Sequence, residues 1–149
     1  MARKRHDRTA AWARRKMSAT ILAFGAPLID PLPGEAPLEL RRALLDLVVQ
    51  IWNAHVMAMP QWGQPHFLVQ MRQTLERNCQ AGELEWEALH AFETLSHERA
   101  RARFASDPRA VGQSSVQMVD PAHWSFSCDA RLPASMNPDA SGRPSPRSA

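Results

Sequence analysis

The sequence predicts an α+β fold that is mostly helical, with about four helices packed around a central apolar helix and a C-terminal β-hairpin. Two observations predict it. Between residues 37 and 105, apolar side chains recur every three or four positions, which is the period of a helix. Between residues 114 and 132 they alternate with polar ones, which is the period of a strand. At 149 residues the chain suits one domain, which we expect to span residues 9–132.

Prolines and glycines divide the helical part. A first helix is expected at about residues 10–25, where Gly25 and Pro27 end it. Residues 27–37 hold four prolines and a glycine, which indicates a loop. A second helix is expected at residues 37–59, before Pro60. It is apolar around most of its circumference and is therefore predicted to be the central helix.

Two further helices and a hairpin follow. The third helix is expected at residues 66–81, with Gly82 just beyond its end, and the fourth at residues 84–105. The fourth is acidic in its first half and basic in its second, which suits the helix dipole. The hairpin is expected at residues 114–132. Its Trp124, Phe126 and Cys128 face must pack on the helices or on a partner, because an isolated hairpin is marginally stable.

The basic residues are unevenly distributed along the chain. Residues 1–16 carry seven of the eighteen basic side chains and one acid, or +6, so residues 17–149 sum to −3. We expect residues 1–8 to be a disordered basic arm and residues 133–149 to be a disordered Pro/Ser-rich tail. The arm could contact nucleic acid or an acidic protein, with Trp12 stacking on bases, or could simply aid solubility. The candidate contacts are Arg3, Lys4, Arg5, Arg8, Trp12, Arg14, Arg15 and Lys16.

Three histidines suggest a different class of function. His90, Glu93 and His97 would share one helix face, and this combination could hold a metal with His55 or Cys79 from a neighbouring helix. His55 could alternatively serve as a general base. The plainer interpretation is that His90, Glu93 and His97 are surface or boundary residues, while Asn53 and His55 bond buried groups. We find no phosphate-binding loop and expect no metal and no cofactor.

The remaining features concern location and partners. Cys79 and Cys128 are far apart and belong to no CxxC pair, so we expect free thiols in a reducing, cytoplasmic compartment. Residues 17–29 imitate the apolar part of a signal peptide, which leaves a secreted protein as an alternative. The run is too short to cross a membrane. The apolar second helix and Trp62, which lies in a turn, favour a protein partner or a homodimer.

Together these features predict a small non-enzymatic interaction or accessory protein. Its basic arm would contact an acidic protein or a nucleic acid, and it would not enter a membrane. The alternative is a small metal-dependent or histidine-based enzyme.

Overall fold

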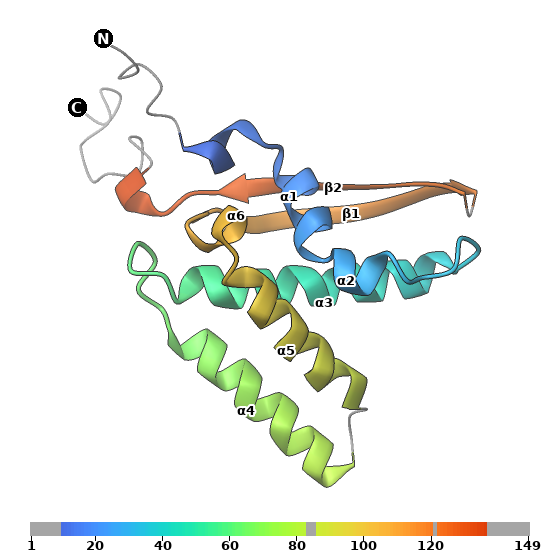
Figure 1. The fold of residues 1–149 in the computed structure, drawn as a ribbon, viewed down its shortest axis with the longest axis horizontal. Helices are drawn as coiled ribbons and strands as arrows, with labels where there is room; N and C mark the ends of the chain where they lie inside the picture. The colour runs from blue at the N-terminus through green and yellow to red at the C-terminus, as the bar shows by residue number, and fades with distance from the viewer. Residues whose placement is uncertain (1–9, 83–85, 121, 137–149) are drawn as a thin grey trace, which may run out of the picture.

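The structure, a computed structural model, describes residues 10–82, 86–120 and 122–136, and it is a mixed helical and β fold. Figure 1 shows helices gathered around α3, with an antiparallel hairpin at the C-terminal end of the described chain, which confirms the predicted fold class. The elements are η1 (Ala11–Arg14), α1 (Met17–Phe24), α2 (Ala26–Ile29), α3 (Leu38–Met57), α4 (His66–Ala81), α5 (Trp86–Arg99), α6 (Ala102–Ala105), β1 (Ala110–Asp120), β2 (His123–Arg131) and η2 (Ala134–Met136).

Helix α3 is the centre of the molecule. The hairpin packs on one side of it, and α4 and α5 lie on the other (Figure 1). Its fully buried residues include Val48, Ile51 and Trp52. Trp52 meets Phe24 of α1 and Phe104 of α6 edge to face, with ring centroids 5.0 and 6.1 Å away. These three rings join α1, α3 and α6 in one core, because edge-to-face pairs are favourable beyond the area they bury.

The hairpin follows the predicted alternation. Val116 pairs with Phe126 and Met118 with Trp124. Val116, Phe126 and Trp124 pack in or against the core. The packing of β1 on α3 and of β2 on α1 gives the hairpin the support that two strands need. The pairing shifts between Val111 and Ser114, where β1 bulges.

Two predicted helices are interrupted, so their predicted extents were wrong. Residues 10–25 form η1 and α1, separated by Arg15 and Lys16 in extended conformation. Residues 84–105 contain α5 and α6, separated at Arg101, which is also extended. Both breaks lie beside long-range contacts: the Arg15 carbonyl accepts a bond from Arg109, and α6 places Phe104 in the core. Tertiary contacts have overridden local helix propensity.

The bounds of the other elements differ less from the predicted ones. Helix α4 begins and ends as predicted, and Gly82 adopts the left-handed conformation of a C-terminal cap, with φ 75°. Helix α3 ends two residues before the predicted boundary at residue 59, and β1 begins at Ala110, four residues earlier than predicted.

The predicted arm, residues 1–8, lies outside the described residues. Residues 134–136 of the predicted tail form η2, and residues 137–149 lie outside the described residues. Within the described chain, we find no helix with the length and apolar character needed to cross a membrane.

Candidate functional site

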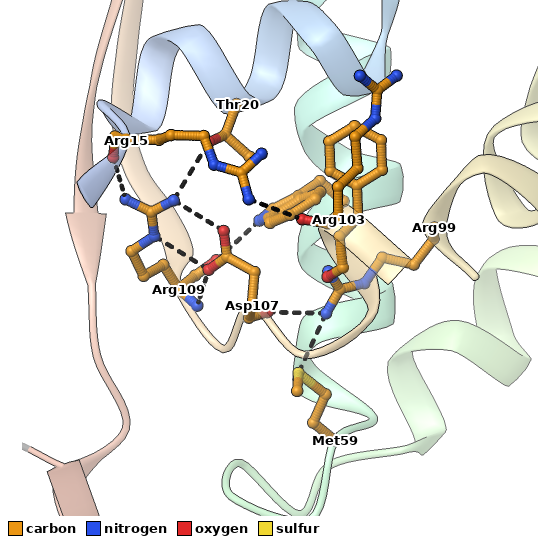
Figure 2. Close-up of polar contacts among 9 residues, drawn as sticks. Arg15, Thr20, Met59, Arg99, Arg103, Asp107 and Arg109 are labelled. Carbon is orange, nitrogen blue, oxygen red and sulfur yellow. Dashed lines mark hydrogen bonds and ion pairs between the residues drawn. The ribbon is translucent and has the colours of Figure 1, made fainter. Parts of the chain in front are cut away.

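The densest polar cluster of the structure lies where α6 leads into β1 (Figure 2). Arg109 donates to both carboxylate oxygens of Asp107, from Nε at 3.0 Å and from Nη2 at 2.7 Å. Its other bonds reach the Thr20 hydroxyl of α1 at 3.2 Å and the carbonyl of Arg15 at 2.8 Å. Its guanidinium also stacks over the ring of Trp12. Asp107 is 1% exposed, so this ion pair is buried.

A second buried arginine holds the preceding turn. Arg99, at the end of α5, donates to the carbonyls of Phe104 and Asp107, and its guanidinium lies 4.4 Å from the centroid of the Trp52 ring. Burial lowers the pKa of Arg99 to about 10, which leaves it charged at neutral pH. A cation in this position is acceptable because carbonyl oxygens and an aromatic face replace its water.

Side chains of α3 and of the turn after it form hydrogen bonds with the backbone of residues 108–111. Trp52 donates its indole N–H to the Arg109 carbonyl, and Trp62 donates to the Pro108 carbonyl, each at 2.7 Å. Asn53 uses both ends of its amide: Nδ2 donates to the Val111 carbonyl and Oδ1 accepts from the Val111 amide. Asn53 therefore pairs with β1 as a neighbouring strand would. These donors are engaged with the chain itself, so the cluster holds the connection to the hairpin and is poorly suited to catalysis.

The predicted basic contacts divide into three groups. Arg3, Lys4, Arg5 and Arg8 lie outside the described residues. Arg14 and Lys16 are exposed, on η1 and directly before α1. Arg15 and Trp12 are half-buried and take part in the cluster, and one face of Trp12 is occupied by Arg109. Trp12 is thus less accessible for stacking on a base than the sequence suggested.

The structure adds two cations to this basic segment. Arg15 Nη2 donates to the Arg103 carbonyl at 3.3 Å, which fastens η1 against α6 although the residues are 88 positions apart (Figure 2). Arg103, whose carbonyl makes this contact, is exposed, and so is Arg101, which directly precedes α6. The sequence placed them in the basic half of a helix, where they suited the dipole, and nothing in their spacing linked them to residues 14–16. We call Arg14, Arg15, Lys16, Arg101 and Arg103 the basic surface.

Among the residues that the structure describes, two acids take part in ion pairs at or beside the basic surface. Glu98 pairs with Arg101 at 3.3 Å, across one helical turn, and Asp107 is consumed by Arg109. An exposed pair of this kind is weak and offsets only part of one charge. Apart from arginine, the exposed residues of η1 and α6 are alanines: Ala11, Ala13, Ala102 and Ala105. The basic surface therefore offers charge and guanidinium donors with small apolar side chains between them.

His55 is placed beside a hydroxyl group. Its Nε2 lies 2.9 Å from Ser96 Oγ of α5, and its ring stacks on Phe92. Burial, with Arg99 and Arg72 nearby, lowers the pKa of His55 to about 4. A neutral imidazole could accept the serine proton, but a base this weak is far from the pKa near 7 that suits general-base catalysis. The bond to Ser96 satisfies a half-buried polar group, as the plainer interpretation expected.

The metal candidates do not assemble. In the part of the chain that the structure describes, no three His, Cys, Asp or Glu side chains are grouped so as to hold a metal ion. His90, Glu93 and His97 are exposed on α5. Cys79 and Cys128 are free thiols, the first buried and the second half-buried, and burial raises the pKa of Cys128 to about 11. Within the described ranges, the histidines and cysteines that the sequence singled out therefore do not form one site.

Comparison with models of protein families, with curated protein sequences and with solved structures finds no match to this chain.

Proposed function

We propose that the protein is a non-enzymatic binding protein whose basic surface contacts the phosphate backbone of a nucleic acid. The observation that carries the proposal is the Arg15–Arg103 contact, which joins two basic segments 88 positions apart on one surface. Residues 1–16, which include Arg14, Arg15 and Lys16 of the basic surface, carry a net charge of +6. Contacts of this kind give affinity that depends on salt and little sequence specificity.

Phosphate suits the basic surface better than an acidic protein does. Protein interfaces draw much of their affinity from buried aromatic anchors, and the exposed residues between these arginines are alanines. A nucleic-acid backbone needs charge and forked donors alone, and guanidinium groups match phosphate oxygens in pairs. The enzymatic alternative has less support, because His55 is bonded to Ser96 with its pKa lowered to about 4.

The proposal is tested by titrating a fluorescent 20-base-pair DNA, and a single-stranded RNA of similar length, with the full chain over a salt series. The test variant is Arg101→Gln with Arg103→Gln, which leaves the Arg103 carbonyl in place for Arg15. We expect the logarithm of the association constant to fall linearly with the logarithm of salt for the unaltered chain. For DNA, the slope of this line should be shallower by about 1.8 in the variant, because each lost phosphate contact contributes about 0.9 to the slope.

The matched control is Arg72→Gln with Arg77→Gln, which removes two exposed arginines from α4. Both double variants lower the net charge equally, so equal losses of affinity would contradict a localised site. Absence of binding to both nucleic acids, with binding to poly-glutamate in the same assay, would assign the basic surface to an acidic protein and overturn the proposal. Deleting residues 1–8 should weaken binding most at low salt and leave the melting temperature nearly unchanged.

A further inference from the structure

An apolar groove lies away from the basic surface, between α2, α3 and α5. Leu28 and Leu32 line it from α2 and the loop that follows, and α3 contributes Leu40, Leu44 and Leu47. Trp86, at the start of α5, completes it and is 64% exposed. The three leucines of α3 stand at positions i, i+4 and i+7, so they form one stripe along the helix. Leu40 is 46% exposed, and the core therefore leaves this stripe partly uncovered.

The size of the groove favours a polypeptide as its occupant. Its volume is about 1300 Å³, which exceeds the 300–1000 Å³ typical of pockets for small molecules. From Leu40 to Leu47 the stripe extends roughly 10 Å, or about two helical turns. An amphipathic helix that lays its apolar side chains into such a groove uses anchors with the same i, i+4, i+7 spacing.

The charges around the groove favour a basic occupant. Glu87 is the one carboxylate among the residues that line the groove, next to His90. Glu39 and Asp46 do not line it, but they are exposed on α3 next in sequence to Leu40 and Leu47. The neighbouring arginines are directed elsewhere. Arg41 is buried and donates to three carbonyls of the preceding loop, and Arg42 reaches toward the Val116 carbonyl on the hairpin. Asp30 and Glu35, in the α2–α3 connection, are exposed acids as well. A groove with acidic surroundings attracts lysine and arginine at the flanks of a helix.

A second copy of the chain and its own termini fit less well. Two copies meeting symmetrically would place two concave surfaces and two acidic margins against each other, which neither fills the groove nor balances its charge. The terminal segments outside the described residues, 1–9 and 137–149, contain one large apolar side chain, Met1. They cannot supply three anchors.

We infer that this groove binds an amphipathic helix of a partner protein, with a leucine-like stripe at i, i+4 and i+7 and basic residues on its flanks. This site is separate from the basic surface, so the inference does not depend on nucleic-acid binding. The two features together describe an adaptor that joins a nucleic acid to a protein.

The inference is tested with two fluorescent 18-residue peptides of alanine with leucine at i, i+4, i+7 and i+11. One carries lysine on both flanks of the leucine stripe and the other carries glutamate. Anisotropy titrations of the full chain should give a dissociation constant in the micromolar range for the lysine peptide and binding at least about tenfold weaker for the glutamate peptide. Leu40→Gln should weaken the lysine peptide by about tenfold or more.

Val69→Gln is the matched control, since Val69 is 54% exposed on α4 and does not line the groove. It should change peptide affinity less than about twofold. Circular dichroism must show the same fold for both variants, which is expected because both side chains are largely exposed. Failure of the lysine peptide to bind, equal binding of the two peptides, or equal effects of the two variants would overturn the inference. A dimer in sedimentation that Leu40→Gln dissociates and Val69→Gln does not would show that a second copy occupies the groove, which also overturns it.

Discussion

Replacing Asp107 with asparagine removes the negative charge from a buried ion pair and leaves Arg109 without its counterion. The side chain of Asp107 is 1% exposed and accepts three bonds from Arg109, two from the guanidinium and one from the backbone amide. Removing one member of a buried pair costs about 3–5 kcal/mol, because an uncompensated charge stays behind. The asparagine oxygen can still accept one bond, so we expect a loss of about 3 kcal/mol. For a domain of this size the melting temperature should fall by roughly 6–12 °C.

Urea unfolding followed by circular dichroism measures this loss directly. The control is Asp46→Asn, an exposed position of α3 where the free energy of unfolding should change by less than about 0.5 kcal/mol. Adding Arg109→Met to each background completes a double-mutant cycle, whose coupling energy should exceed about 1.5 kcal/mol. A loss below about 1 kcal/mol for Asp107→Asn, or additive effects in the cycle, would show that the pair is solvated and that the cluster does not hold the hairpin in place.

Three other predictions concern single side chains. Because the pKa of His55 is about 4 in the folded chain and near 6.5 in the unfolded chain, the unfolded chain binds a proton first as pH falls. Stability should therefore decrease between about pH 6.5 and 4, by up to roughly 3 kcal/mol, and His55→Gln should flatten this decrease in urea titrations. Asn53→Ala should cost about 1–2 kcal/mol and accelerate hydrogen exchange at the Val111 amide, measured by NMR. Cys128, whose pKa is about 11, should react with iodoacetamide at pH 8 at least about tenfold more slowly than glutathione, as mass spectrometry of its peptide would show.

Elements delimited by proline and glycine were predictable from the sequence. Helix α4 lies between Pro65 and Gly82, and the two strands of the hairpin lie close to the predicted residues 114–132. The interruptions at Arg15 and Arg101 were not predictable, because both residues suit a helix. The Arg15 carbonyl accepts a bond from the distant Arg109, and the break at Arg101 precedes Phe104, which packs on Phe24 and Trp52. Local patterns contain no information about such partners.

The arginines show the same limit for the site. Arg99, Arg101 and Arg103 are spaced two apart and look alike in sequence, yet Arg99 is buried against Trp52 and the other two are exposed. Which of them turns inward depends on where Phe104 and Asp107 present their carbonyls. Accordingly, the basic character of residues 1–16 could be predicted from the sequence. The contact between Arg15 and α6 could be found only from the folded structure.

The contact of α1 with β2 places the first described α-helix against the last strand. During synthesis, α1 leaves the ribosome long before β2 has been made. Until then, the apolar side of α1 is either exposed or covered by other contacts. Helices α3, α4 and α5 are consecutive and can pack locally as they emerge, while Thr20 and Arg15 meet Arg109 only near the end. The arginine cluster can therefore form only after residues 107–109 have been synthesised, and it then fixes α1 to the segment that leads into the hairpin.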